Sequence, residues 1–514
     1  MRLVALLGVT LVIAGAASAA RVVGTNGADR LAGTAGADTI SGLGGRDLLS
    51  GSRGPDFLHG GAGRDALDGG PGPDRIATSY DGARDVVRCG TGADVVNADL
   101  VDSVAADCEL VSRRLSRDPY TTADAQHETQ VEPDSLTVGR TTVVTYQVGR
   151  RHDGAATNIG FAVSRDNGRT WQSGLLPGLT QASVPPGPSA RASDPVVAFD
   201  AKARVWLIST LALAGPTTRL TISRSPDGLR WSAPIDAAIA GAGGTAFDKN
   251  WIACDNGTTS PFRGSCYLAY TDTLRSDRLA VATSRDGGLT WSQPAGVPVT
   301  SAVGALPVIR PNGELALIFL WAGRRIGSAV SVDGGVTFGE PVIVSEVQTR
   351  PARGLRFFPL PSAAVDPAGR IWVTWHDCRF SPGCASNSVV ATQSSDGRSW
   401  PPPVRVTRGR NAMLPTLGIH PTSGRIAFLY HVVRPGNLVD VELLDVVPGR
   451  RFPEPRRLSA QTMRPAWMPT TVSGRMLADY VSVHYAGARP LAIWVLASEP
   501  VGSSLRQAVY ATRG

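Results

Sequence analysis

Six aspartates recur at nine-residue intervals near the N-terminus, and this spacing of carboxylates is the strongest chemical signal in the sequence. Residues 24–77 form six consecutive nonapeptides with the pattern G-x-x-G-x-D-x-[L/I]-x. The glycines permit tight turns, the aliphatic residue points inward from a very short strand, and the aspartate lies at the turn edge. Stacked turns would build rows of carboxylate and carbonyl oxygens, which suit Ca²⁺ with its about six to eight oxygen ligands better than Mg²⁺. The expected metal ligands are these six aspartates and one later recurrence: Asp29, Asp38, Asp47, Asp56, Asp65, Asp74 and Asp94.

The nonapeptides resemble the calcium-binding RTX, or haemolysin-type, repeats, whose family pattern is G-G-x-G-x-D followed by an aliphatic strand. The resemblance covers roughly residues 24–97 and implies a parallel β-roll with bound Ca²⁺ as its cofactor. The second position departs from the family in the first four units, where it reads Thr25, Thr34, Leu43 and Ser52. A metal-free glycine-rich linker is the alternative, but it would not keep aspartate and an aliphatic residue in strict phase. The repeat degrades over residues 78–108, which predicts a cap on the roll.

The N-terminus has the features of a secretory signal: Arg2, an apolar run over residues 3–14, and the small residues Ala17-Ser18-Ala19 before a cleavage site. No later apolar run approaches the ~20 residues that a membrane span needs. We therefore expect a secreted, extracellular monomer without a membrane span.

Six cysteines in an exported chain predict disulfides. Their spacing offers three local pairs, and zinc binding is the weaker interpretation because no CxxC motif occurs. The predicted pairs are Cys89 with Cys108, Cys254 with Cys266, and Cys378 with Cys384.

The net charge of +8 is unevenly divided along the chain. Residues 24–112 carry 14 acidic and 7 basic residues, whereas residues 113–514 carry 42 basic and 29 acidic ones. An acidic roll is consistent with cation loading, and a basic remainder could attract anionic substrates such as acidic glycans. Nucleic-acid binding is not expected, since there is no basic block or basic helix.

A second motif, S-x-D-x-G-x-T-W, recurs in the remainder of the chain. It stands at residues 164–171, 284–291 and 331–338, and in a form shorter by one residue at 225–231 and 394–400. These are similar to the Asp boxes of the sialidase (BNR repeat) superfamily of β-propellers. Each box would be a tight turn between two strands, with its aspartate bonding the turn backbone and its aromatic residue wedged between blades. The aspartates expected in this structural role are Asp166, Asp227, Asp286, Asp333 and Asp396.

Alternating strand-like runs, such as residues 196–199 and 205–210, precede each box and complete a blade. Seven such units can be counted, and the last could gain its fourth strand from a segment before residue 131. The predicted fold class is therefore all-β: an N-terminal parallel β-roll followed by an Asp-box β-propeller. Seven blades are favoured, and the six blades of the sialidase family are the alternative. The expected domains are a signal peptide (1–20), the roll with its cap (21–112), a linker (113–130) and the propeller (131–514).

The resemblance to sialidases also implies where catalytic residues would lie. Such enzymes hold a substrate carboxylate with three arginines, use a tyrosine and a glutamate as nucleophile pair, and use an aspartate as acid/base. The [F/Y]-R-I-P motif that supplies one arginine is absent, because residues 132–136 read EPDSL instead. The candidates on the expected functional face are Arg350, Arg353, Arg356, His376, Asp377, Arg379, Asp479 and Tyr480.

Each catalytic candidate has a structural alternative. Arg350, Arg353 and Arg356 could form a carboxylate clamp, since guanidinium groups bind planar carboxylates well, or could be solvated surface residues. Tyr480 could be a buried strand tyrosine, and residues 376–380 could be a loop stiffened by a disulfide. We expect a secreted calcium-binding protein whose propeller recognises, and could hydrolyse, extracellular glycans in the manner of an exo-α-sialidase. The alternatives are a non-catalytic adhesion scaffold that binds carbohydrate or protein, such as a cell-surface glycoprotein, and another glycoside hydrolase or lyase.

Overall fold

The computed structural model describes residues 10–12, 18–78, 80–215, 217–240 and 247–514. The chain divides into two compact units, and each is described here by itself. In the described residues the helical segments are four 3₁₀ turns, and everything else regular is strand, so the predicted all-β class is confirmed. None of the described helices is long and apolar enough to cross a membrane. The 3₁₀ turns are η1 (Thr273–Arg275), η2 (Pro382–Cys384), η3 (Pro435–Asn437) and η4 (Pro465–Trp467).

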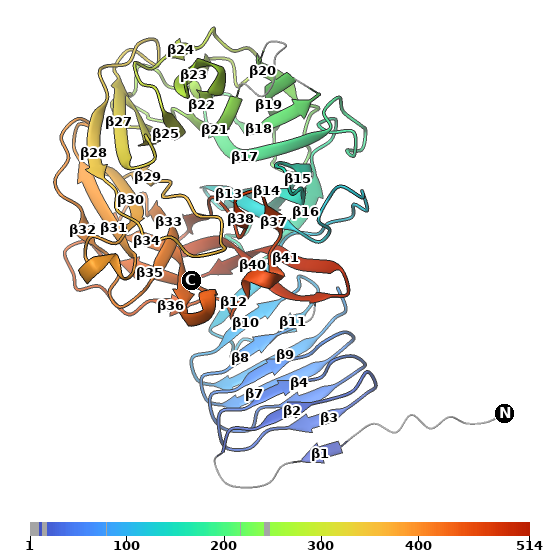
Figure 1. Cartoon of the computed structure of the whole chain (residues 1–514). Helices are drawn as coiled ribbons and strands as arrows, with labels where there is room; N and C mark the ends of the chain where they lie inside the picture. The colour runs from blue at the N-terminus through green and yellow to red at the C-terminus, as the bar shows by residue number, and fades with distance from the viewer. Residues whose placement is uncertain (1–9, 13–17, 79, 216, 241–246) are drawn as a thin grey trace. The chain divides into compact units, whose positions relative to one another are not determined.

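The first unit comprises Met1–Leu115, Arg456–Thr462 and Tyr510–Gly514, and its main part is a parallel β-roll (Figure 1). Successive nonapeptides alternate between two parallel sheets, so one full coil is two nonapeptides long. One sheet has the order β1 (Thr10–Val12), β3 (Arg30–Ala32), β5 (Leu48–Ser50), β7 (Ala66–Pro71), β9 (Val86–Thr91) and β11 (Ser103–Val104). The other contains β2 (Arg21–Val23), β4 (Thr39–Ser41), β6 (Phe57–His59), β8 (Arg75–Ala77), β10 (Val95–Ala98) and β12 (Leu110–Arg114).

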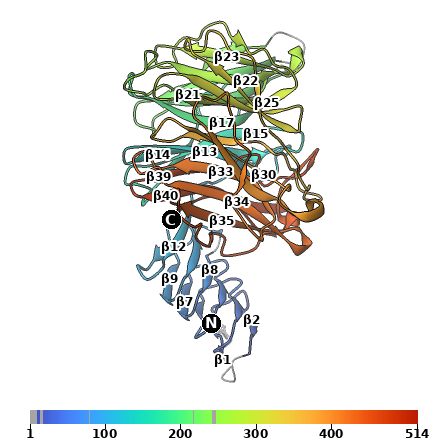
Figure 2. The same cartoon turned by 90° about the vertical axis from the view of Figure 1, so that its left-hand side faces the viewer.

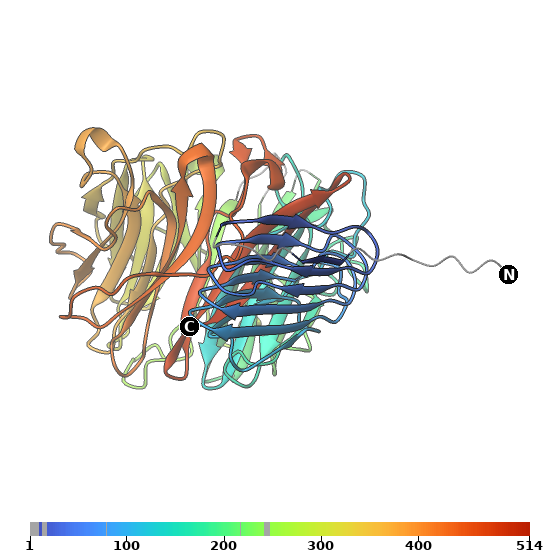
Figure 3. The same cartoon turned by 90° about the horizontal axis from the view of Figure 1, so that it is seen from below.

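The aliphatic residue of each nonapeptide forms the core of the roll. Leu31 pairs with Leu49 in one sheet, and Ile40 pairs with Leu58 in the other. All six of these eighth-position residues are no more than 2% exposed. Figure 3 shows the coils of this unit stacked one behind another. The prediction of a parallel roll is confirmed.

Two other parts of the chain cover the last coil of the roll. Asn97 donates from Nδ2 to the carbonyl of Leu458 (3.1 Å) and accepts at Oδ1 from the N–H of Ala460 (2.7 Å). Residues 510–512, the end of β41 (Ser504–Arg513), pair antiparallel with residues 112–114. The predicted Cys89–Cys108 disulfide is present, and Cys89 lies in the apolar core. Strand β36 (Arg456–Arg457) belongs to the covering segment.

Strand β1 falls inside the predicted signal peptide, residues 1–20, where it pairs with β3. The other residues of the expected apolar run, 3–9 and 13–14, lie outside the described residues. Cleavage and export stay predictions, as do the predicted domain bounds.

The second unit comprises Ser116–Pro455 and Met463–Val509 and is a succession of antiparallel sheets. The first eight strands belong to one sheet of two four-stranded groups, because β15 and β17 pair at one position. These groups are β13 (Gln130–Val138), β14 (Thr141–Arg150), β15 (Ala156–Ser164) and β16 (Gln172–Leu175), then β17 (Arg191–Asp200), β18 (Val205–Ala214), β19 (Thr217–Ser225) and β20 (Ile235–Ile239). The next two are β21 (Phe247–Cys254), β22 (Cys266–Asp272), β23 (Arg278–Ser284) and β24 (Ala295–Gly296), then β25 (Ala302–Ile309), β26 (Leu315–Trp321), β27 (Arg325–Ser331) and β28 (Val342–Glu346).

The later sheets continue this pattern. They are β29 (Ser362–Val365), β30 (Ile371–Asp377), β31 (Ser388–Ser394) and β32 (Val404–Arg405), then β33 (Ala412–Ile419), β34 (Ile426–Arg434) and β35 (Leu438–Val446), then β39 (Ser482–Ala486) and β40 (Arg489–Val501) with β41. A small hairpin, β37 (Thr470–Thr471) and β38 (Gly474–Arg475), precedes the last group. The number of blades stays a prediction.

The sheets of the second unit pack face to face around a common axis. Each apolar cluster joins residues of successive sheets, as Ile222 of β19 and Leu268 of β22 do. The aromatic residues of the Asp boxes pack against these clusters; Trp291, for example, lies against the cluster that contains Ile222. Strand β39 contacts both β13 and β33, and the three strands lie close together in Figure 2. The first and last sheets are therefore neighbours, as a closed propeller requires.

The Asp boxes form tight turns. In the first, Asp166 Oδ1 accepts from the N–H groups of Arg169 (3.0 Å) and Thr170 (2.9 Å), and Trp171 Nε1 donates to the carbonyl of Gly168 (3.2 Å). Although burial opposes it, these bonds and the Thr170 hydroxyl lower the pKa of Asp166 to about 2. The disulfides Cys254–Cys266 and Cys378–Cys384 are also present, so all three predicted pairings are confirmed.

Candidate functional site

The repeat aspartates form two ladders along the roll. Asp47 Oδ1 accepts from the backbone N–H of Asp29 (2.8 Å), 18 residues earlier, and Asp56 Oδ1 accepts from that of Asp38 (2.8 Å). The same bond recurs from coil to coil, for instance from the N–H of Asp47 to Asp65 (2.9 Å). One oxygen of each carboxylate is thus used to hold the coils in register, and the other remains for a second task.

The second oxygen, Oδ2, lies beside the first glycine of its own unit and a carbonyl of the next coil. A Cβ atom added to Gly69 would lie 2.5 Å from Asp74 Oδ2 and 2.6 Å from the Cys89 carbonyl oxygen. A Cβ added to Gly24 would meet Asp29 Oδ2 and the Gly42 oxygen, each at 2.6 Å. Glycine is needed here because oxygens approach the backbone closely, and these glycines do not adopt a left-handed φ.

In the later turns this Oδ2 atom is buried without a hydrogen-bond donor. Among the described residues this holds for Asp47, Asp56, Asp65, Asp74, Asp85 and Asp94. All six side chains are nearly fully buried. An ionised carboxylate in this state is costly unless a cation neutralises it.

Burial also makes these carboxylates harder to ionise, because it raises their pKa values. Burial raises the pKa of Asp47 and Asp56 to about 6 and that of Asp74 to about 7, with the backbone donors opposing the shift. Orphaned carboxylate oxygens next to backbone carbonyls suit Ca²⁺, which binds such mixed oxygen ligands. No three His, Cys, Asp or Glu side chains of the described residues cluster into a metal site, so each turn would rely on backbone oxygens as well.

Asp85 belongs to this ladder, although the sequence pattern did not reveal it. Its Oδ1 accepts from the N–H of Asp65 (2.8 Å), 20 residues earlier, and burial raises its pKa to about 8. Two extra residues in the turn before it break the nine-residue period. The surviving signal is the run Asp85-Val86-Val87, which keeps the aspartate and the inward aliphatic residue at their usual distance. The ladders end at Asp102 and Glu109, which accept from the N–H groups of Asp85 (3.0 Å) and Asp94 (3.0 Å).

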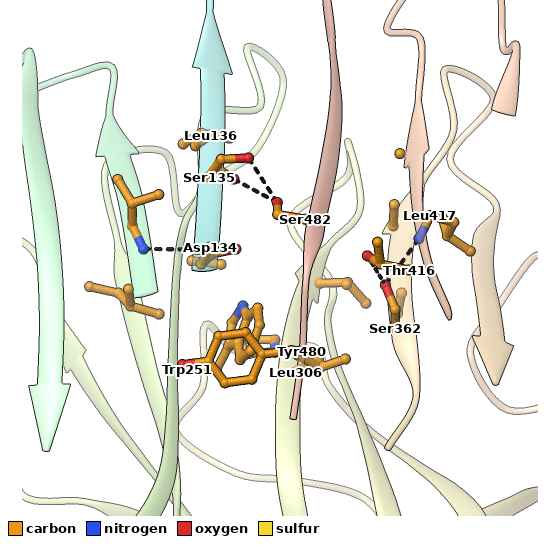
Figure 4. Close-up of a pocket in the computed structure, with 18 of the residues that line it drawn as sticks. Asp134, Ser135, Leu136, Trp251, Leu306, Ser362, Thr416, Leu417, Tyr480 and Ser482 are labelled. Carbon is orange, nitrogen blue, oxygen red and sulfur yellow. Dashed lines mark hydrogen bonds between the residues drawn. The ribbon is translucent and has the colours of Figure 1, made fainter. Parts of the chain in front are cut away.

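The second unit contains a cavity of about 380 Å³ on the axis around which its sheets pack (Figure 4). Its wall consists of the first strands of successive sheets, tied together by side-chain hydrogen bonds. Asp134 Oδ2 accepts from the N–H of Val197 (2.9 Å), and the hydroxyl groups of Ser135 and Ser482 lie 2.8 Å apart. Ser362 and Thr416 make a similar bond at 3.0 Å. The cavity wall is therefore fixed by bonds between sheets as well as by packing.

Three charged residues in or beside this wall stand at bulges with a left-handed backbone. Glu132, Asp194 and Lys249 have φ values of 51°, 46° and 49°, and the strand register shifts at each of them. A left-handed conformation costs a non-glycine residue roughly 1–2 kcal/mol. The same bulge recurs in β13, β17 and β21, so three neighbouring sheets present a charged side chain at equivalent places.

These side chains meet around Lys249. Its Nζ lies 2.7 Å from Asp479 Oδ2, 3.1 Å from Asp194 Oδ1 and 3.5 Å from Glu132 Oε1. Arg356 binds Asp479 from the other side, with Nε 2.7 Å from Oδ1 and Nη2 2.6 Å from Oδ2. Asp194, Lys249 and Asp479 line the cavity.

The carboxyl groups of this cluster ionise very differently. Burial raises the pKa of Glu132 to about 8, with Lys249 opposing the shift. Burial acts on Asp479 too, but Lys249 and Arg356 hold its pKa well below the usual range. The cluster thus combines a carboxyl group with a raised pKa, a carboxyl group with a lowered pKa, and a lysine whose pKa the surrounding carboxylates raise well above its usual value against the effect of burial.

Two aromatic side chains lie next to the charged cluster. Trp251 and Tyr480 pack edge to face with ring centroids 5.2 Å apart, and both line the cavity (Figure 4). Burial, with Glu132 and Asp194 adding to it, raises the pKa of Tyr480 well above its usual value, so the phenol stays neutral. Its hydroxyl group lies 3.4 Å from the carbonyl of Pro195.

The structure brings together only some of the predicted catalytic residues. Arg356, Asp479 and Tyr480 meet at the cavity, whereas Arg350 and Arg353 are exposed. Arg379 bonds Asp377, which also accepts from Trp375 Nε1 (3.0 Å).

His376 is fully buried, its ring lies 4.4 Å from that of Phe357, and burial lowers its pKa to about 3. It is therefore neutral at physiological pH. The sequence placed Asp194 and Lys249 among the polar residues of the expected functional face without singling them out as catalytic. It did not indicate Glu132 or Trp251, whose position before or within the first strand of a blade was the only available signal.

Comparison with known families identifies the repeats of the roll. The family model of the RTX calcium-binding nonapeptide repeat (4 copies) matches residues 23–58 and 41–76. The first unit therefore contains RTX calcium-binding repeats, in agreement with the sequence pattern. The match ends before Asp85 and Asp94. No match was found among the curated proteins.

Solved structures similar to this chain include sialidases and a polysaccharide lyase. A Hadza microbial sialidase is 18% identical, with 59% of this chain and 64% of that chain covered and a TM-score of 0.44. Trypanosoma rangeli sialidase is 12% identical, with 66% and 60% covered and a TM-score of 0.43. An ulvan lyase is 11% identical, with 76% and 96% covered and a TM-score of 0.48. This chain spans less than two thirds of the length of either sialidase.

Proposed function

We propose that this is an extracellular calcium-binding protein whose second unit binds a saccharide in the axial cavity. The observation that carries the proposal is the meeting of Asp194, Lys249 and Asp479 with Trp251 and Tyr480 at one cavity. Sugar hydroxyl groups need both donors and acceptors, and the apolar faces of sugar rings pack on aromatic side chains. Fixed polar groups in a mostly apolar cavity are typical of small-ligand sites.

The charges in the cavity favour a neutral saccharide over an acidic one. Arg356 is the only member of the predicted arginine clamp that reaches the cluster, and both of its contacts to Asp479 are already made. A ligand carboxylate would also approach the Asp479 carboxylate, whose pKa Lys249 and Arg356 hold well below the usual range. Repulsion from like charges would weaken its binding.

In the roll, Ca²⁺ would be held by the repeat aspartates and the neighbouring backbone oxygens. It would supply the positive charge that the buried Oδ2 atoms lack. Because each Oδ1 atom already bonds the preceding coil, an ion on Oδ2 would stabilise the stack and take no part in a reaction. The predicted export supports this role, since calcium is abundant outside cells and disulfides persist there.

Binding of the full chain to an array of neutral and sialylated glycans tests the proposed cavity. We expect retention of neutral glycans, and a loss of about tenfold or more in affinity for Trp251→Ala, since such aromatic anchors carry much of the binding energy. The matched control is Phe380→Ala, at an exposed aromatic residue that does not line the cavity. Retention of sialylated glycans alone would restore the sialidase-like interpretation. If no glycan is retained, the saccharide-binding proposal is wrong and the alternative of a protein-binding scaffold remains.

Hydrolysis of the bound saccharide is a second candidate, favoured by the opposite pKa shifts of Glu132 and Asp479. Glycosidases use one protonated and one ionised carboxyl group. If Glu132 donates the proton, Glu132→Gln should lower kcat about 100-fold or more while binding persists. Glu454→Gln, at an exposed residue, is the control. Absence of any released sugar from neutral polysaccharides would exclude hydrolysis and leave the binding proposal intact.

A further inference from the structure

The first two turns of the roll differ from the later ones in what contacts the aspartate. Thr25 donates from its backbone N–H (2.5 Å) and its hydroxyl group (2.9 Å) to Asp29 Oδ2. Thr34 makes the same two bonds to Asp38 Oδ2, at 2.5 and 3.1 Å. In the described turns that carry Asp47, Asp56, Asp65, Asp74, Asp85 and Asp94, this oxygen has no donor at all. The atom that a metal would use is therefore already hydrogen-bonded in the first two turns.

The backbone of the turn changes at the same place. From the third unit on, the residue at the second position has a positive φ. The value is 73° at Leu43 and 77° at Ser52, and the glycines at this position in the next two units, Gly61 and Gly70, also have a positive φ. The fourth position changes too: Gly45 has a φ of 116°, whereas Gly27 and Gly36 lie outside the left-handed region. Leucine and serine rarely adopt this conformation, so local preference does not explain the later form. Something outside the turn must stabilise it.

We infer that the first two turns bind no calcium ion, because Thr25 and Thr34 take its place at Asp29 and Asp38. Calcium loading then begins at Asp47 and extends through Asp85 to Asp94, beyond the residues that match the repeat family. This inference rests on the calcium binding proposed above and states which turns carry it out. The threonine hydrogen bonds stabilise the buried Oδ2 atom in the first two turns, and a bound calcium ion would stabilise it in the later turns through its charge.

Ser52 shows that a hydroxyl group at this position is not sufficient. Its Oγ donates to the carbonyl of Gly33 (3.2 Å), and Asp56 Oδ2 stays without a donor. With a left-handed φ, Ser52 directs its hydroxyl group away from the aspartate. The turn conformation and the identity of the side chain together decide whether the oxygen is capped.

The number of calcium ions bound by the full chain, measured by equilibrium dialysis, tests the inference with a matched pair of variants. Asp38 and Asp56 are successive members of one ladder. We expect Asp56→Asn to lower the number of bound ions and Asp38→Asn to leave it unchanged. Thr34→Gly, which creates the family pattern, should raise the number. An equal loss in Asp38→Asn and Asp56→Asn would overturn the inference.

A second measurement needs no substitution, and therefore does not depend on whether the variants fold. Crystals of the unsubstituted chain grown with Tb³⁺, which replaces Ca²⁺ in oxygen sites, should give anomalous peaks beside Asp47, Asp56, Asp65, Asp74, Asp85 and Asp94. No peak should lie in the first two turns, at a site formed by Asp29 or Asp38 without one of the later aspartates. Peaks in those two turns would overturn the inference while supporting calcium binding. Absence of every peak would refute calcium binding itself.

Discussion

Arg356 holds Asp479 through two parallel contacts, Nε to Oδ1 at 2.7 Å and Nη2 to Oδ2 at 2.6 Å. The two residues lie 123 positions apart, and the Asp479 side chain is only 1% exposed. Lys249 approaches the same carboxylate at 2.7 Å. This pair anchors the loop before β29 to the segment before β39, and it fixes the position of an ionised group on the cavity wall.

Removal of the arginine from this pair should destabilise the second unit. We expect Arg356→Ala to lower the free energy of unfolding by about 3 kcal/mol, since it leaves Asp479 buried with one cation fewer. Arg353→Ala, at an exposed arginine of the same loop, should change it by less than about 0.5 kcal/mol. Chemical denaturation of both variants measures this. Equal stabilities would mean that Lys249 alone suffices.

Chelation of calcium should unfold the later coils of the roll. Six buried carboxylates would lose their counter-charge, and the ladders that depend on them would open. Hydrogen exchange of the full chain should then speed up over residues 48–98 on addition of a chelator, and should be unchanged over β14 and β18. Protection of residues 48–98 that is independent of calcium would contradict the prediction.

The Asp boxes should make the second unit sensitive to acid. Against the effect of burial, hydrogen bonds from the turn lower the pKa of Asp166, Asp286 and Asp333 to about 2. Because the unfolded value is about 3.9, their contribution to stability is complete above pH ~4 and is lost as the pH falls through ~2. Asp286→Asn should therefore show a smaller loss of stability between pH 4 and pH 2 than the unsubstituted protein. Identical pH profiles would rule out the effect.

The first glycine of each nonapeptide should tolerate no side chain. In Gly69→Ala the new Cβ would meet Asp74 Oδ2 and the Cys89 carbonyl oxygen at 2.5 and 2.6 Å, and we expect a loss of about 1–3 kcal/mol. Gly27→Ala is the matched control, since its Cβ would meet only the Thr25 hydroxyl at 3.6 Å and its φ is ordinary. Thermal unfolding in calcium compares the two. A similar melting temperature for both would show that the coils can separate locally.

The roll could be predicted from the sequence because its determinants are local. The nonapeptide places Asp47 and Leu49 on their turn and strand without reference to any distant residue. The three disulfides were predictable for the same reason, since each joins cysteines close in sequence. Asp85 was not predicted as a ligand, because two inserted residues shift the nine-residue period although the hydrogen-bonded ladder continues through Asp85.

The axial cavity could not be predicted in the same way. The bulges at Glu132, Asp194 and Lys249 require a left-handed backbone at residues that seldom adopt it, so neither glycine nor asparagine marks them. Their meeting depends on three sheets closing around one axis. The arginine clamp was predicted because its three members are close in sequence. In the structure, Arg356 binds Asp479, which is 123 residues away, whereas Arg350 and Arg353 are exposed.

In the regular nonapeptides each aspartate pairs with a residue 18 positions away, which restricts how the length of this part of the roll can change. An insertion or deletion of two nonapeptides would keep every later strand in its own sheet and every ladder continuous. A change of one nonapeptide would transfer all later strands to the opposite sheet and exchange the roles of Asp102 and Glu109 as ladder ends. Gene duplication within this roll should therefore be tolerated in steps of 18 residues, and natural variants of its length should differ by that unit.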